Sequence, residues 1–203
     1  MSTNFIKKEM PEEYLRSIRA ISDKKPILKG SHRGPMANYI GCLGMYAFYS
    51  WVNKKLAVDY KSLGVDDLRA EIIDVYNYDV LVSFTYNGKK YSFKVEVKTK
   101  DRNVAPLSNY EISVPINTYE FQIPDYYFAL SLNKKNRRIE NDFSPLDIYL
   151  LGFISREGYD TNKYLEKVGL KGNGANFFVD TWNVYINKLK EPDQFPLGII
   201  KCT

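Results

Sequence analysis

Asp79, Glu96 and Lys98 have the types and the spacing that metal-assisted chemistry requires. Asn87-Gly88 separates two stretches of alternating apolar residues, a pattern typical of a β-hairpin with a type I′ turn. Counting back from a two-residue turn places Asp79 opposite Glu96, and alternation puts both carboxylates and Lys98 on one face. Carboxylates that face each other across a strand pair repel, and a bound divalent cation removes that repulsion. The hairpin therefore predicts a site for Mg²⁺ or Mn²⁺.

The opposite face of this hairpin is apolar and suited to a core; it carries Val80, Val82, Phe84, Tyr86, Tyr91, Phe93, Val95 and Val97. A four-residue loop would place Asp79 opposite Lys98 without changing the faces, whereas an odd-length loop or a bulge would separate the carboxylates. Acid-x-Lys also occurs at 23–25 and 59–61, but neither match ends an alternating strand that faces a second acid. The context of Glu96 thus distinguishes it from the other two.

Asp79 followed by Glu96-Val97-Lys98 resembles the D…(D/E)-x-K signature of the PD-(D/E)XK nuclease superfamily. That superfamily has the restriction-endonuclease-like fold and includes Holliday-junction resolvases and RecB-type exonucleases. The resemblance covers about residues 35–155 and implies a Mg²⁺-dependent nuclease that hydrolyses phosphodiester bonds of nucleic acid, with DNA the expected substrate. By the same resemblance, Asp79, Glu96 and the main-chain carbonyl of Val97 would hold the metal, and Lys98 would orient or help to deprotonate the attacking water.

The stretch Gly41-Cys-Leu-Gly44-Met45 resembles the G-x-x-G-E segment that many members of the superfamily carry on the helix before the catalytic strands. Where those relatives have a glutamate that adds an acid to the site, this chain has Met45. Two other hypotheses therefore stay open. One is a catalytically degenerate protein of the same fold that binds nucleic acid or a protein partner without cleaving, and the other is an unrelated α/β interaction protein.

Basic residues occur in local clusters within a chain of net charge +5. Such clusters suit a polyanionic partner, because phosphate contacts supply affinity that is independent of sequence. We expect Lys100 and Arg102, which directly follow the predicted site, and Arg33, beside the lone His32, to contact nucleic acid. His32 lies in a glycine-bounded loop and is not required for the chemistry.

Strands and helices alternate around the hairpin, which predicts one α/β domain over residues 1–203 with a central mixed β-sheet flanked by helices. We expect strands at 71–76, 125–132 and 147–154, helices at 11–21, 36–55 and 115–122, a turn and short helix at 62–70, and a loop at 103–113. An N-terminal helix would precede the core at 35–155. A C-terminal helical extension, with helices at 164–170 and 181–189, would follow it.

The composition is that of a folded protein, with 44% hydrophobic and 26% charged residues. The sequence has no apolar run of membrane-spanning length and no signal-peptide segment, so we expect a cytoplasmic protein that does not bind membranes. Two distant cysteines, Cys42 and Cys202, argue for reduced thiols rather than a zinc site. Both a monomer and a homodimer are compatible with the sequence.

Overall fold

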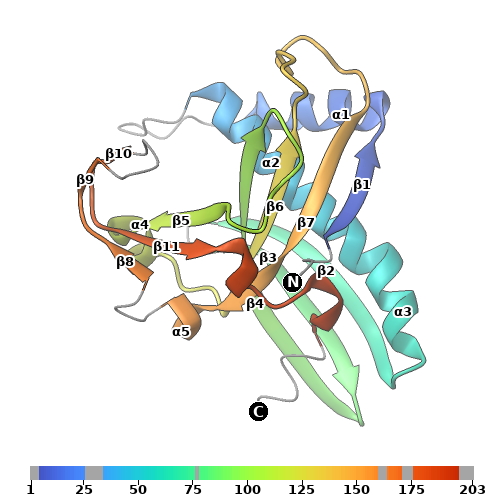
Figure 1. Ribbon diagram of the computed structural model, residues 1–203. Helices are drawn as coiled ribbons and strands as arrows, with labels where there is room; N and C mark the ends of the chain where they lie inside the picture. The colour runs from blue at the N-terminus through green and yellow to red at the C-terminus, as the bar shows by residue number, and fades with distance from the viewer. Residues whose placement is uncertain (1–4, 26–33, 76–77, 160–163, 171–175, 197–203) are drawn as a thin grey trace.

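A computed structural model describes residues 5–25, 34–75, 78–159, 164–170 and 176–196 of the chain. Its centre is a six-stranded sheet in the order β1-β7-β6-β4-β3-β2, in which β4 and β6 are parallel and the other neighbours are antiparallel (Figure 1). The strands are β1 (Ile6–Met10), β2 (Val65–Val75), β3 (Tyr78–Tyr86), β4 (Lys89–Arg102), β6 (Tyr126–Asn133) and β7 (Leu146–Ser155). The predicted α/β class with a mixed sheet is confirmed.

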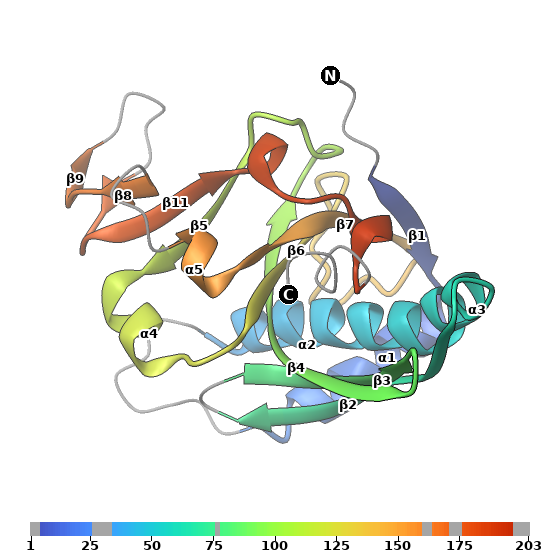
Figure 2. The same cartoon turned by 90° about the horizontal axis from the view of Figure 1, so that it is seen from below.

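The sheet curls around one long helix, α2 (Pro35–Ser50), which continues in wider π-helical turns through Trp51–Leu56 (Figure 2). Pro35 suits the first turn of α2 because its missing N–H would have no partner there. α1 (Glu12–Ser22) packs beside α2, and α3 (Ala57–Lys61) leads into β2. The main apolar core lies inside this curl, between α2 and the face of the sheet that carries Val80, Val95 and Phe128.

The outer face of β6 and β7 is covered by a second, three-stranded sheet, where the expected architecture has flanking helices. Its order is β5-β11-β8, and its strands are β5 (Glu111–Pro115), β8 (Leu165–Glu166) and β11 (Thr181–Tyr185). A short pair of strands, β9 (Gly169–Leu170) and β10 (Asn176–Phe177), lies next to it, and the helices α4 (Ile116–Phe121) and α5 (Arg156–Tyr159) flank it (Figure 1). Turns of 3-10 helix follow at Ile186–Lys188 and Pro192–Gln194.

The prediction of a C-terminal helical extension is wrong. Residues 181–185 form a strand because Trp182 and Val184, two residues apart, bury one face against Tyr127 and Tyr159 of the main body. Thr, Trp, Val and Tyr are residues that favour strands when a sheet surface is present to receive them. The predicted helix at 164–170 is replaced by β8 and β9.

The other predicted elements agree with the structure except at two places. The turn predicted within 62–70 is present at 62–64, but no helix follows it, because β2 begins at Val65, whose side chain is buried in the core opposite Tyr86 of β3. The expected loop at 103–113 ends early, because β5 begins at Glu111. Within the described ranges, no helix is long and apolar enough to cross a membrane.

Candidate active site

The β3–β4 hairpin has the register that its turn predicts. Asn87 and Gly88 both adopt positive φ, 48° and 73°, as a type I′ turn requires. Val82 faces Phe93, and Val80 faces Val95, in a ladder that ends there on the β3 side. From Val95 to Arg102, β4 pairs instead with β6 on its other edge. Asp79 therefore lies where β3 and β4 stop pairing, next to Glu96.

The Asp79 carboxylate acts as the hydrogen-bond acceptor that a main-chain carbonyl would provide if the β3–β4 ladder continued. Its Oδ2 accepts a hydrogen bond of 2.8 Å from the N–H of Val97, which the continued register would have placed opposite Tyr78. In an antiparallel ladder the N–H and C=O of one residue point to the same neighbouring strand. The carbonyl of Val97 therefore points to the same edge as the Asp79 carboxylate, where it is available as a further oxygen ligand.

Glu96 and Lys98 form a tight group with a residue that the sequence analysis missed, Gln122. Glu96 Oε1 lies 2.7 Å from Lys98 Nζ and accepts a hydrogen bond of 2.6 Å from Gln122 Nε2. Lys98 also donates to Gln122 Oε1 at 3.1 Å. The Glu96 and Lys98 side chains are only 9% and 12% exposed, and the Lys98 ammonium lies 5.8 Å from the centre of the Tyr127 ring. Both charged groups are held in place on a mostly dehydrated surface.

The surroundings of Asp79 disfavour the ionised form of its carboxyl group, because the nearby positive charge is too small to offset burial and the charge of Glu96. Burial, reinforced by the negative charge of Glu96, raises the pKa of Asp79 from 3.8 to about 7. The hydrogen bond from Val97 and the nearby Lys98 act in the opposite direction but do not compensate. Two carboxylates with one ammonium carry a net negative charge, which is the condition under which a hard divalent cation binds to oxygen ligands.

Lys100 and Arg102 continue the Lys98 face of β4 toward the small sheet. Lys100 Nζ donates to Ser113 Oγ at 3.2 Å, and Ser113 donates in turn to Asn183 Oδ1 at 2.8 Å. Arg102 stacks on the Tyr110 ring, with its guanidinium carbon 3.9 Å from the ring centre. Burial lowers the pKa of Lys100 to about 8 and also lowers the pKa of Arg102. Neither cation forms an ion pair with a carboxylate in the described part of the chain.

Met45 lies on the other side of the main sheet. It is 3% exposed and belongs to the core inside the curl, whereas Glu96 and Lys98 lie on the outer face. The neighbouring Gly44 fixes this arrangement, because a Cβ on it would lie 1.7 Å from Thr99 Oγ1 of β4. The small residue lets α2 lie against the inner face of β4, and Met45 fills core volume.

The remaining predicted site residues can be placed only in part. Arg33 and His32 lie outside the described residues. Among the residues that the structure describes, no three His, Cys, Asp or Glu side chains gather into one group that could hold a metal. A metal at this site would instead use Asp79, Glu96 and the Val97 carbonyl, with water completing its shell.

The side chains that the sequence analysis missed come from the segment between β4 and β6 and from the C-terminal strand. Gln122 follows α4, Ser113 lies on β5 and Asn183 on β11. A single Gln, Ser or Asn without a motif carries no signal in the sequence; only the burial of Gln122 and Asn183, 8% and 5% exposed, marks them in the structure.

Searches of protein-family models, curated proteins and solved structures find no match for this chain. What the protein does is therefore inferred from the side chains of the site.

Proposed function

We propose that this protein is a metal-dependent nuclease of the PD-(D/E)XK type, which hydrolyses phosphodiester bonds of nucleic acid, with DNA the first substrate to test. The proposal is carried by one observation: Asp79, Glu96 and Lys98 lie close together where the pairing of β3 and β4 ends. The restriction-endonuclease-like fold is part of the proposal. It is supported by the chain order of hairpin, helix α4 and strands β6 and β7 within residues 78–155.

The residues at this point fit a hard divalent cation such as Mg²⁺ or Mn²⁺. Asp79 and Glu96 supply carboxylate oxygens, and the Val97 carbonyl points to the same edge of β4 as the Asp79 carboxylate. When bound, the metal lowers the pKa of a coordinated water and offsets the charge of the phosphate.

The chain's own residues orient the reactants. Lys98 presents an ammonium beside Glu96, where it can hold the attacking water and oppose charge that develops on the phosphate. Gln122 bonds to both Glu96 and Lys98, so it fixes the two side chains relative to each other. Low exposure of this group keeps bulk water away and strengthens each charge interaction.

A second function, binding of nucleic acid without cleavage, is favoured by one observation. Met45 is buried on the opposite side of the sheet, so α2 adds no third acid to the site through that position. The two functions differ in their metal requirement, because only cleavage needs a cation at Asp79 and Glu96.

The test is incubation of the purified protein with linear, single-stranded, branched and supercoiled substrates in Mg²⁺, Mn²⁺ and EDTA. We expect cleavage in Mg²⁺ or Mn²⁺, none in EDTA, and loss of cleavage in Asp79→Asn, Glu96→Gln and Lys98→Met variants that remain folded. Glu71→Gln, which changes an exposed carboxylate on β2, is the matched control and should cleave normally.

Full activity of the three site variants would refute the nuclease assignment to this group. Binding of nucleic acid that is equal in EDTA and Mg²⁺, without cleavage of any substrate in either metal, would favour the non-cleaving function.

A further inference from the structure

Three cations occupy alternate positions on the outer face of β4 and lead into the candidate active site. Lys98, Lys100 and Arg102 follow one another at intervals of two residues, which on a strand corresponds to about 6.6 Å. This spacing is close to the separation of neighbouring phosphates along one nucleic-acid strand. The Lys98 side chain is mostly buried and those of Lys100 and Arg102 are half-buried, so the three form a recessed row rather than an exposed basic surface.

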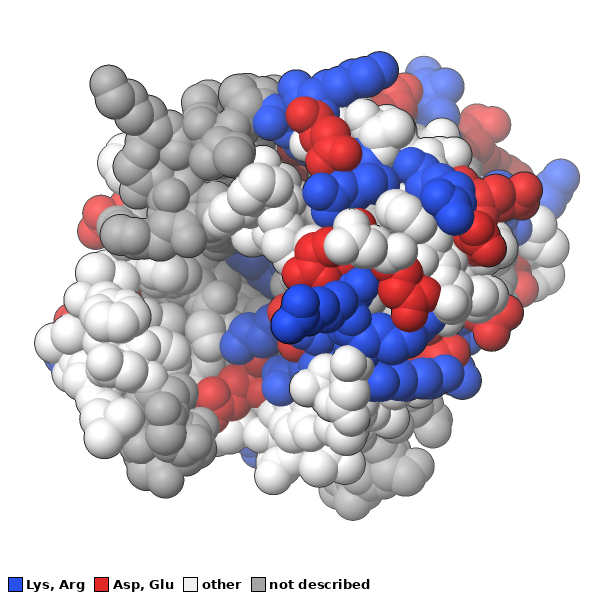
Figure 3. All heavy atoms as spheres, turned by 90° about the horizontal axis from the view of Figure 1, so that it is seen from above, with Lys and Arg blue, Asp and Glu red and all other residues white. Residues whose placement is uncertain are grey.

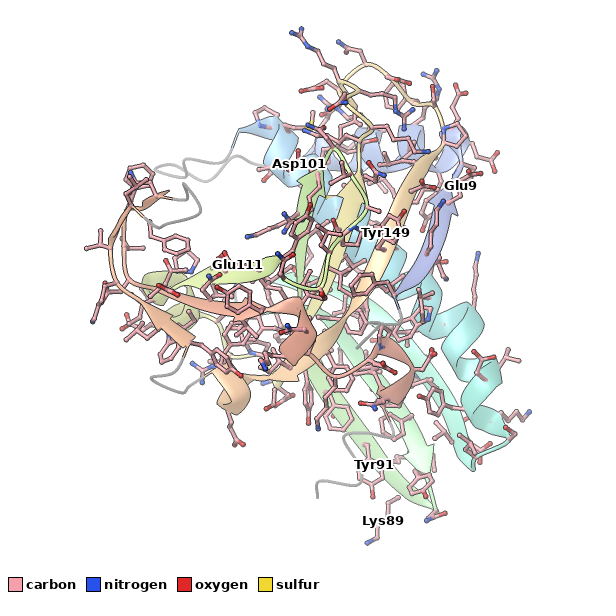
Figure 4. All side chains as sticks on the ribbon, in the orientation of Figure 1. Glu9, Lys89, Tyr91, Asp101, Glu111 and Tyr149 are labelled. Carbon is pink, nitrogen blue, oxygen red and sulfur yellow. The ribbon has the colours of Figure 1, made fainter. Side chains whose placement is uncertain are left out.

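The small sheet closes one side of this row. Ser113 of β5 touches the Lys100 ammonium, and the backbone carbonyl of Glu111 accepts a hydrogen bond of 3.4 Å from Arg102. Figure 4 shows Glu111 beside the end of β4 that carries Asp101. Figure 3 looks onto this end of the main sheet and shows a hollow with Lys and Arg side chains gathered along it. The cations are thus reached from a recess between two parts of the molecule.

An exposed aromatic residue lies at the other end of the row. Phe121 is 73% exposed, and it is the immediate neighbour of Gln122, which contacts Glu96 and Lys98. Ile123, on the other side of Gln122, is 46% exposed. Exposed aromatic rings together with cations are the combination that single-strand-binding proteins use, because every base has a face that can stack on a ring.

We propose that the substrate is a single strand of nucleic acid, or a single-stranded end, whose phosphates follow Arg102, Lys100 and Lys98 into the site and whose next base stacks on Phe121. This inference rests on the proposed nuclease function and specifies its substrate class. A duplex presents two rigid backbones and cannot bring consecutive phosphates of one strand down to cations that contact β5. A flexible single strand can, with its bases turned away from the row.

The test is binding of a fluorescently labelled oligonucleotide, as DNA and as RNA, compared with a blunt duplex of the same sequence. Anisotropy is measured in EDTA so that nothing is cleaved. We expect the single strand to bind at least about tenfold more tightly than the duplex, the difference that stacking of one base provides. Phe121→Ala should abolish most of that preference, and Phe121→Trp should restore it.

Lys100→Met should weaken binding and reduce the slope of log Kd against log salt by about 0.7, the share of one phosphate on a single strand. Two variants at the far end of the molecule serve as controls. Lys89→Met removes an exposed lysine at the hairpin tip (Figure 4), and Leu63→Ala removes an exposed apolar side chain near it; both should bind like the wild type.

Equal or tighter binding of the duplex, or Phe121→Ala and Lys100→Met variants that behave like the two controls, would overturn the single-strand inference. Metal-dependent cleavage of duplex substrates in that case would leave the nuclease function intact. Absence of both binding and cleavage for every substrate would overturn both.

Discussion

Replacing Asp79 by asparagine should stabilise the metal-free protein at neutral and alkaline pH. The change removes a negative charge that burial and Glu96 make unfavourable, and the amide oxygen of asparagine can still accept the hydrogen bond from the Val97 N–H. Asp79 thus combines a destabilising effect in the metal-free protein with its proposed role as a metal ligand, and the variant separates the two.

The magnitude follows from the pKa of Asp79, which is about 7 in the folded protein and 3.8 for an unperturbed aspartate. Each pKa unit corresponds to about 1.4 kcal/mol, so an ionised Asp79 lowers the free energy of unfolding by about 4 kcal/mol at most. Because the folded-state pKa is raised, the protonated form contributes stability that is complete below pH 3.8 and is lost as the pH rises through about 7. Wild type should therefore become less stable across this interval, and Asp79→Asn should not.

The assay is urea unfolding of both proteins near pH 5 and near pH 8, in EDTA and in Mn²⁺. In EDTA, we expect Asp79→Asn to be more stable than wild type near pH 8 and closer to it near pH 5. Mn²⁺ that binds only the native state stabilises it by RT ln(1 + [Mn²⁺]/Kd), about 2.7 kcal/mol at a hundred times Kd. Wild type should gain this near pH 8, and the variant should gain much less.

The control is Glu71→Gln, which removes an exposed carboxylate from β2 and should follow wild type in all four conditions. The reasoning is refuted if wild type is indifferent to Mn²⁺ near pH 8 and Asp79→Asn is no more stable than wild type in EDTA. The two carboxylates would then not share a site.

Three further variants test how the site is supported. Gly44→Ala should destabilise the fold by about 1–3 kcal/mol in urea unfolding, because its Cβ would meet the Thr99 side chain, whereas Gly41→Ala has free space and should not. Met45→Glu should lower the free energy of unfolding by about 3–5 kcal/mol, as expected for a buried unpaired charge, and should not tighten Mn²⁺ binding in calorimetry. Met45→Leu should lower the free energy of unfolding by less than about 1.5 kcal/mol. Gln122→Leu should lower cleavage by about 10- to 100-fold with little loss of stability, because Glu96 and Lys98 keep their direct ion pair but lose the amide that fixes the orientation of both.

The parts of the fold that the sequence predicts correctly are those in which local chemistry decides the structure. Asn87-Gly88 sets the turn, the turn sets the register, and the register places Asp79 next to Glu96. Strands β6 and β7 are likewise recognisable as apolar runs of strand length between polar segments. In these cases no distant contact is needed to choose between helix and strand.

The C-terminal segment shows the opposite situation. Between Thr181 and Leu189 the apolar residues fit a helical stripe as well as an alternating strand, so periodicity cannot decide between the two. The decision comes from β5, about 70 residues earlier, which offers an edge with Ser113 opposite Asn183. The same contact brings Ser113 and Asn183 to Lys100, which is why this part of the site could not be predicted either.

Gln122 shows how topology can complete a site without a motif. β6 runs parallel to β4, and Tyr126 pairs with Val95, so the segment that enters β6 must pass beside the first residues of the candidate site. Gln122 precedes Tyr126 by four residues and follows the last residue of α4, which sets the direction of entry. The crossover that makes β6 parallel to β4 therefore also carries the side chain that joins Glu96 to Lys98, and the exposed Phe121 directly precedes that side chain in the chain. An antiparallel β6 would have needed only a short turn, and β4 would then have had no segment from which a residue could reach across its outer face.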